Sequence, residues 1–178
     1  MALRLGLFHQ LVADRDRNTA RSDIGKHRQR KANMIKLVQN KIDEMAAMQA
    51  IKSDDAGACV LFSGTTRRFT GEQETSTLHY EAYEAMAMKE LSRLREDAIG
   101  KWSLIECAIV HRLGEVPIGE TSVVVAVSSA HRVDAFAAAQ WIMDTLKKDV
   151  PVWKQEVWAD GKTEWIHPTK TPAEPGSN

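Results

Sequence analysis

The run SVVVAVSS, from Ser122 to Ser129, constrains the fold of this chain more than any other segment. It is the most β-branched run in the sequence, and such a run predicts a strand at the centre of a sheet. A helical pattern follows it directly, and Ser128 or Ser129 is expected to cap that helix, because serine accepts hydrogen bonds from unpaired helix N–H groups. Apolar residues then recur at intervals of three and four. The expected core positions of this helix are Phe136, Ala139, Ile142, Met143 and Leu146.

The sequence before this run alternates between strand and helix patterns. A short strand over 35–38 leads into a helix of about three turns. The continuous apolar run ACVLFSGTT predicts a strand buried on both faces. The stretch RRFTGEQETS is predicted to be a polar loop and TLHYEAY a strand. Glu84 to Lys101 is predicted to form an amphipathic helix, and SLIECAIVHRLGEV another strand followed by a glycine turn.

Pro151 is expected to end the helix that follows the central strand. After it, VWKQEVW, ADGKT and EWIHP predict a strand, a hairpin turn and a return strand. The complete order of elements is β-α-β-β-α-β-β-α-β-β. This order predicts the α+β class, with a single domain in which about three helices pack on a mixed or antiparallel sheet.

The folded domain is expected to span residues 34–168. Residues 1–33 are predicted to be a disordered extension, and the Pro-, Gly- and Ser-rich residues 169–178 a flexible tail. The extension is Arg-rich with an apolar start, as in a mitochondrial transit peptide, but its aspartates argue against that address. No apolar run approaches the roughly 20 residues that span a bilayer, so no membrane association is expected.

The charge balance limits the classes of partner. Lys plus Arg and Asp plus Glu number 24 each, so no global positive field favours nucleic acid, and any anion recognition must be local. The two cysteines, Cys59 and Cys107, lie far apart inside apolar runs and are expected to be buried, inert thiols. Such free thiols are typical of a reducing cytosol, which is the expected location.

Two cationic motifs lie where predicted strands end. In SSAHR, His131 and Arg132 occupy the first turn of a helix, where unpaired N–H groups and the positive dipole end favour anions. Arg132 could instead form an ion pair with Asp134, with His131 packed against its neighbours, and the sequence leaves both interpretations open. In FSGTTRR, Arg67 and Arg68 follow a buried strand and could face a pocket, although loop arginines are usually solvated.

A third motif, LKKDVPVWKQE, places lysines on both sides of Pro151. Lys147 lies in the last helical turn, where a cation also suits the negative dipole end. Lys154 follows on a strand, and the break lets both lysines approach one rim. A partly buried lysine can act as a nucleophile or proton carrier. The cations together predict one pocket for an anionic ligand. No histidine has zinc-ligand spacing and no phosphate-binding loop occurs, so neither a metal nor a cofactor is expected.

Five segments together resemble the large, catalytic subunit of molybdopterin synthases: GACVLFSGTTRR, LHYEAYEAMA, HRLGEVPIGE, VAVSSAHRVDAF and LKKDVPVWKQE. The resemblance runs from about residue 34 to 165 in the family's order and spacing. It implies an α/β-hammerhead fold and a sulfurtransferase that converts cyclic pyranopterin monophosphate into molybdopterin. It also implies a small ubiquitin-like partner whose C-terminal Gly-Gly carries the sulfur as a thiocarboxylate. The family forms a central dimer of large subunits with a small subunit at each end, a heterotetramer.

The resemblance assigns roles to six residues. Lys147 matches the family's essential lysine, which meets the acyl carbon of the thiocarboxylate, and Lys154 matches the second active-site lysine. Arg67, His131 and Arg132 match residues that hold the substrate phosphate and developing negative charge, and Phe62 matches an apolar wall.

One segment departs from the family pattern. Some members carry an arginine shortly after the tryptophan that matches Trp165, whereas this chain has WIHPTK, with Lys170 as the nearest cation. The alternative function is a non-catalytic adaptor that keeps the fold. The presence of both Lys147 and Lys154 favours the enzyme.

Overall fold

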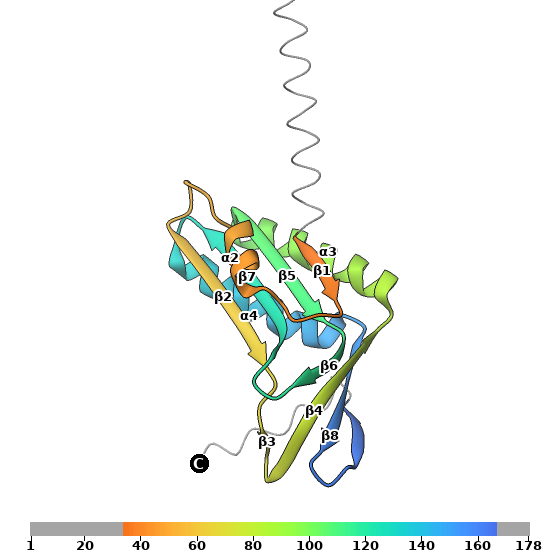
Figure 1. Cartoon of the computed structure of the whole chain (residues 1–178). Coiled ribbons are helices and arrows are strands. Elements are labelled where there is room, and N and C mark those ends of the chain that lie inside the picture. Colours follow the sequence, from red (N-terminus) through yellow and green to blue (C-terminus); the bar gives the residue numbers. More distant parts are fainter. Residues whose placement is uncertain (1–33, 167–178) are drawn as a thin grey trace, which may run out of the picture. The chain divides into compact units, whose positions relative to one another are not determined.

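The computed structural model describes residues 34–166 (Figure 1). The predicted extension (1–33), the tail (169–178) and Lys170 lie outside these residues. The described elements are β1 (Ile35–Val38), α2 (Glu44–Ala50), β2 (Ala58–Thr65), β3 (Phe69–Thr70), β4 (Gln73–Ala82), α3 (Glu84–Trp102), β5 (Glu106–Arg112), β6 (Gly114–Pro117), β7 (Thr121–Ser129), α4 (Arg132–Asp149), β8 (Val152–Trp158) and β9 (Thr163–Ile166). No helix in this part combines the length and apolar composition that a bilayer crossing needs.

The strands form two sheets. The first has the order β1-β5-β7-β2, in which β1 runs parallel to β5 and the other neighbours are antiparallel. The second is antiparallel, with the order β3-β4-β8-β9 and with β6 paired to β4. Helices α3 and α4 cover one face of the first sheet and α2 covers the other (Figure 1). The predicted α+β class, with three helices on mixed and antiparallel sheets, is confirmed.

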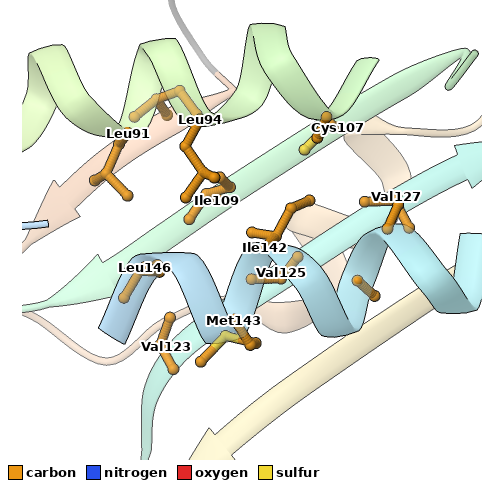
Figure 2. Packing of buried hydrophobic residues seen from close by; sticks show 14 of the residues in the cluster. Leu91, Leu94, Cys107, Ile109, Val123, Val125, Val127, Ile142, Met143 and Leu146 are labelled. Atoms are coloured by element: carbon orange, nitrogen blue, oxygen red, sulfur yellow. The ribbon is translucent and has the colours of Figure 1, made fainter. Parts of the chain in front are cut away.

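Strand β7 forms the centre of the core, as its β-branched run predicts. All nine of its residues are buried. Val123, Val125 and Val127 pack against α3 and α4, where Ile142 and Leu146 meet them (Figure 2). The alternate residues Val124 and Ala126 belong to the smaller core under α2. Because a strand alternates its side chains between faces, a run this apolar requires cover on both sides.

Strand β2 differs from its prediction. It was expected to be buried on both faces, but it lies at the edge of the first sheet and is only partly buried. Cys59 on this strand is exposed, so its prediction as a buried thiol is wrong. Cys107 on β5 is buried, as predicted, and burial raises the pKa of its thiol to about 12. A continuous apolar run indicates that neighbouring elements pack against the strand. It does not specify whether the strand lies at the centre or at the edge of the sheet.

Helix α4 also differs in detail from its prediction. Ser128 and Ser129 do not cap it, because both remain in β7 and the cap position is His131. Phe136, expected in the core, is 64% exposed, and the neighbouring Ala135 is buried instead. The buried stripe begins one residue earlier than the large apolar side chain suggests, because the turn into the helix sets which face meets the sheet.

Three predictions about where elements begin and end can be compared with the structure. Helix α2 has seven residues and two turns rather than three, and the Asp43 side chain caps it by accepting from the Ala46 N–H. The loop predicted over 67–76 contains the short β3–β4 hairpin. Helix α4 ends at Asp149, and Val150 is extended, as expected for the residue before a proline.

His111 on β5 is buried and predicts a pH-dependent stability. Burial lowers its pKa to about 4, although a hydrogen bond between its Nδ1 and the Arg112 carbonyl oxygen (2.8 Å) partly offsets this effect. The unfolded chain takes up a proton near pH 6.5, whereas the folded chain does so only near pH 4. The stabilising contribution is therefore present above pH 6.5 and is lost as the pH falls. The free energy of unfolding should decrease by roughly 3 kcal/mol over this window.

Denaturant unfolding at pH 7, 5.5 and 4 measures this decrease. The variant His111→Gln keeps a side chain of similar polarity without the titration, so its free energy of unfolding should depend less steeply on pH. Identical pH profiles for the two proteins would contradict the assignment.

Candidate active site

Two lysines flank the corner at which α4 turns into β8. The N–H of Val150 still bonds to the carbonyl of Leu146 (3.1 Å), and Pro151 then prevents the helix from continuing. Lys147 is exposed in the last turn of α4, and Lys154 is the third residue of β8. We call Lys147, Pro151 and Lys154 the lysine corner. The predicted break at Pro151 therefore brings both lysines to the same end of α4.

Lys154 has a buried carboxylate as its counter-ion. The Nζ of Lys154 lies 3.4 Å from Oε2 of Glu156, and the side chains are 32% and 2% exposed. Residues 154 and 156 share one face of β8 because side chains alternate along a strand. The hydroxyls of Thr70 and Thr75 donate to Oε1 of Glu156 at 2.7 and 2.6 Å. These contacts hold the carboxylate in place, so the ammonium of Lys154 is tethered at a defined position.

The environment of Glu156 keeps it ionised. Burial alone would raise its pKa, but the hydrogen bonds from Thr75 and Thr70 and the nearby Lys154 ammonium outweigh burial and lower the pKa below its usual range. Glu156 was not predicted from the sequence as a site residue. Its position two residues after Lys154 in a predicted strand was the available signal, since it places both side chains on one face.

Glu156→Gln should destabilise the protein, because the amide leaves Lys154 without its counter-ion and weakens two hydrogen bonds to a charged group. The expected loss is about 2 kcal/mol at pH 7. A lowered pKa stabilises the folded state above the unfolded value of 4.5 and loses this effect as the pH falls. The stability difference between the variant and the wild type should therefore shrink as the pH falls below 4.5, measured by denaturant unfolding. A constant difference at all pH values would show that the charge of Glu156 is not responsible.

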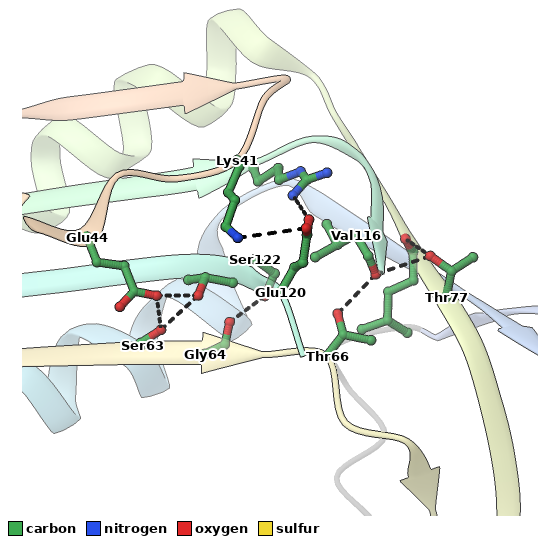
Figure 3. Close-up of polar contacts among 12 residues, drawn as sticks. Lys41, Glu44, Ser63, Gly64, Thr66, Thr77, Val116, Glu120 and Ser122 are labelled. Carbon is green, nitrogen blue, oxygen red and sulfur yellow. Dashed lines mark hydrogen bonds and ion pairs between the residues drawn. The ribbon is translucent and has the colours of Figure 1, made fainter. Parts of the chain in front are cut away.

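Arg67 follows the end of β2, and the residues around it are fixed by polar contacts (Figure 3). The Thr66 N–H donates to the Glu120 carbonyl (3.0 Å), and its hydroxyl donates to the Val116 carbonyl (3.2 Å). Thr70, three residues after Arg67, donates to Glu156, and Glu156 in turn contacts Lys154. Arg67 is exposed and forms no ion pair with any acidic residue in the part of the chain that the structure describes. Within these residues, the charge of Arg67 is therefore not neutralised by a carboxylate.

The carboxylate of Glu44, on α2, fixes the end of β2 from the face of the sheet that α2 covers (Figure 3). Ser63 on β2 donates to it at 2.9 Å, and Thr121 at the start of β7 donates to the same oxygen. These two hydrogen bonds lower the pKa of Glu44, and the one from Thr121 has the larger effect. The ionised carboxylate thus connects α2 to both β2 and β7, close to the point where the chain leaves β2 and continues to Arg67.

Phe62 lies on the α4 side of β2, opposite Val125, and is 39% exposed. Its ring passes over Gly64, because a Cβ at Gly64 would lie 3.3 Å from Cε1 of Phe62 and 2.7 Å from Cγ1 of Val123. A side chain at position 64 would therefore displace this ring. The absence of a side chain at Gly64 lets Phe62 present an apolar surface near the end of β2.

His131 and Arg132 lie at the other end of the sheet. Ala58, at the start of β2, pairs with Ser129, whereas Thr65, at its end, pairs with Thr121. The start of α4 is thus next to the start of β2, and Arg67 is at the opposite end. Arg132 and Lys147 are fifteen positions apart in one continuous helix, which corresponds to about 22 Å along its axis.

The structure does not bring all six predicted residues together in one chain. Lys154 is linked through Glu156 to the segment that holds Arg67, and Lys147 lies at the same end of α4. His131 and Arg132 form a second, separate group. The single pocket predicted from the sequence is therefore not formed by one chain, because antiparallel pairing of β2 and β7 places the two groups at opposite ends.

The alternative role of Arg132 finds no support in residues 34–166. Within them, Arg132 forms no ion pair with Asp134 or with another acidic side chain, and His131 is exposed rather than packed. The same residues contain no group of three or more His, Cys, Asp or Glu side chains that could hold a metal ion.

Comparisons with known proteins identify the family. Residues 37–149 match the family model described as MoaE protein. The molybdopterin synthase catalytic subunit of Culex quinquefasciatus is 44% identical over 137 residues, covering 75% of this chain and 87% of that protein. The one from Thermoplasma volcanium is 37% identical and covers 74% and 96%. The crystal structure of molybdopterin synthase from Staphylococcus aureus has a TM-score of 0.70 and 35% identity, covering 73% of this chain and 94% of that one. This chain therefore belongs to the MoaE protein family.

Proposed function

We propose that this chain is the catalytic subunit of a molybdopterin synthase. In this role it converts cyclic pyranopterin monophosphate into molybdopterin, with sulfur from the C-terminal thiocarboxylate of a small ubiquitin-like subunit. The observation that carries the proposal is the lysine corner of a MoaE family member, in which Lys154 is held by the buried carboxylate of Glu156. The catalytic domain is proposed to span 34–168, with 1–33 and 169–178 outside it, and the enzyme is proposed to work in the cytosol.

The charges of the site suit this chemistry. The phosphorylated pterin and the thiocarboxylate are both anions, so a site that binds both needs several cations. Lys147 is proposed to meet the acyl carbon as an acid, base or transient nucleophile, and Lys154 to hold developing negative charge nearby. Arg67 is proposed to bind the phosphate, and Phe62 to offer an apolar surface to the pterin ring.

His131 and Arg132 are proposed to act in the site of a second copy. Arg132 and Lys147 of one chain lie at opposite ends of α4, about 22 Å apart along the helix axis. A dimer of large subunits, which the family resemblance implies, lets the start of α4 of one copy complete the lysine corner of the other. The proposed catalytic unit is therefore a dimer with two composite sites and one small subunit at each.

A direct assay tests the function. The purified chain is mixed with a thiocarboxylated ubiquitin-like partner and cyclic pyranopterin monophosphate, and the dithiolene product is measured. Product formation that depends on this chain supports the enzyme. Tight binding of the partner without any product would instead support the non-catalytic adaptor.

A further inference from the structure

The turn between β6 and β7 is bonded to Thr66, the residue that precedes Arg67 (Figure 3). This turn, residues 117–120, carries the chain from the second sheet into the first. It is closed by a hydrogen bond from the Glu120 N–H to the Pro117 carbonyl (3.1 Å), the pattern of a β-turn. We call residues 117–120 the crossover turn.

Three hydrogen bonds hold Thr66 against this turn and the strand before it. The Thr66 N–H donates to the Glu120 carbonyl (3.0 Å), and the Thr66 carbonyl accepts from the Gly119 N–H (2.8 Å). The Thr66 hydroxyl donates to the Val116 carbonyl on β6 (3.2 Å). Thr66 is buried, so these bonds are shielded from water. Because Arg67 is the next residue, its backbone begins at a point that the crossover turn fixes.

Arg112, the last residue of β5, holds the acidic side chain of the crossover turn. Its Nη1 lies 2.5 Å from Oε2 of Glu120, and only 11% of the Arg112 side chain is exposed. This hydrogen bond is the main cause of a lowered pKa at Glu120, so the carboxylate is ionised at neutral pH. Lys41 lies 3.9 Å from the other carboxylate oxygen, but its side chain is 73% exposed. Solvated ion pairs contribute little, so Arg112 is the partner that fixes Glu120.

The contacts of Arg112 favour a role in geometry over a role in stability. Its Nε is buried and has no hydrogen-bond partner among residues 34–166. An unpaired buried N–H costs free energy, and apolar residues of the same volume often stabilise a fold as well as a buried ion pair does. A short, charge-assisted hydrogen bond does, however, hold a carboxylate in one place. The ion pair therefore specifies where the crossover turn lies.

We propose that Arg112 is a positioning residue for Arg67, the proposed phosphate ligand. Through Glu120, Arg112 fixes the crossover turn, and through Thr66 the turn fixes the backbone from which Arg67 reaches the phosphate. Arg112 acts through these contacts and not by touching the substrate. This inference rests on the proposed function, because it assigns the phosphate to Arg67.

Arg112→Gln should raise the KM for cyclic pyranopterin monophosphate about tenfold, while kcat stays within about twofold of the wild type. Displacement of Arg67 weakens an interaction that is made equally in the bound substrate and the transition state, which changes KM alone. A general folding defect would instead reduce the amount of active enzyme and lower the apparent kcat. Glu120→Gln removes the same ion pair from a less buried position and should raise KM equally, even if Arg112→Gln folds poorly. The measurement is steady-state dithiolene formation with the thiocarboxylated partner.

Lys41→Gln provides the matched control. It removes the exposed partner of the same carboxylate and should leave KM unchanged. A double-mutant cycle then tests the route of the effect. In an Arg67→Ala background, Arg112→Gln should cause no further rise in KM, because the residue through which it acts is already absent.

Amide hydrogen exchange gives a readout that needs no substrate. The amides of Thr66 and Gly119 should exchange faster in Arg112→Gln than in the wild type, whereas those in the centre of β7 should not change. Unchanged exchange at both amides, or an unchanged KM in an active Arg112→Gln enzyme, would overturn this inference and leave the proposed function intact. An equal rise in KM from Lys41→Gln, or a further rise in the Arg67→Ala background, would also overturn it. A wild-type chain that forms no dithiolene would contradict the proposed function, and the exchange rates alone would then decide whether Arg112 fixes the crossover turn.

Discussion

Lys147→Ala should lower the rate of molybdopterin formation by about 10²–10³-fold or more, because it removes the cation proposed to meet the acyl carbon. The side chain is exposed at the end of α4, so the substitution removes no buried contact. The free energy of unfolding should therefore stay close to that of the wild type. Binding of the small subunit should also remain largely intact. Single-turnover measurement of dithiolene formation checks this prediction.

Lys148 provides the matched control. It is the next residue of the same helical turn and is also exposed, so Lys148→Ala makes the same chemical change and keeps the same helix. This variant should retain near wild-type turnover. If Lys147→Ala and Lys148→Ala were equally active, the general positive charge of the helix end would matter and Lys147 would have no specific role.

Mixing two inactive variants should restore activity if the site is composite. Lys147→Ala lacks the lysine corner, and Arg132→Ala lacks the group at the start of α4. A mixed dimer has one site with both defects and one with neither. Random exchange of subunits makes half of the dimers mixed, so about a quarter of the wild-type activity should return. The measurement is dithiolene formation after the two variants have been unfolded and refolded together.

The control for this experiment is a mixture with two defects in the same half of the site. Lys147→Ala and Lys154→Ala both damage the lysine corner, so every mixed dimer keeps a defect in each site and activity should not return. Absence of recovery in the first mixture as well would place Arg132 outside the site of the second copy. Full activity of the Arg132→Ala variant alone would show that Arg132 has no part in catalysis or substrate binding.

Features of this protein that depend on a single helix or strand were predicted from the sequence, whereas features that depend on distant segments were not. The strand at β7, the helix that begins at Glu84 and the break at Pro151 were all predicted, because each depends on side chains within one element. The cap of α4 and the exposure of Phe136 were not, because they depend on how the chain enters the helix. Glu156 was missed since its importance comes from Thr70 and Thr75, which are more than 80 residues away in the sequence.

The sequence alone determined the class of fold, the lysines on either side of Pro151 and the resemblance to the family, because periodicity and motif spacing are local properties of the chain. Only the tertiary structure decided that β2 is an edge strand and that His131 and Arg132 lie at the opposite end of α4 from Lys147. Strand order and direction come from pairing between distant segments, and no local pattern encodes them. The antiparallel pairing of β2 with β7 is therefore what divides the predicted site into two halves.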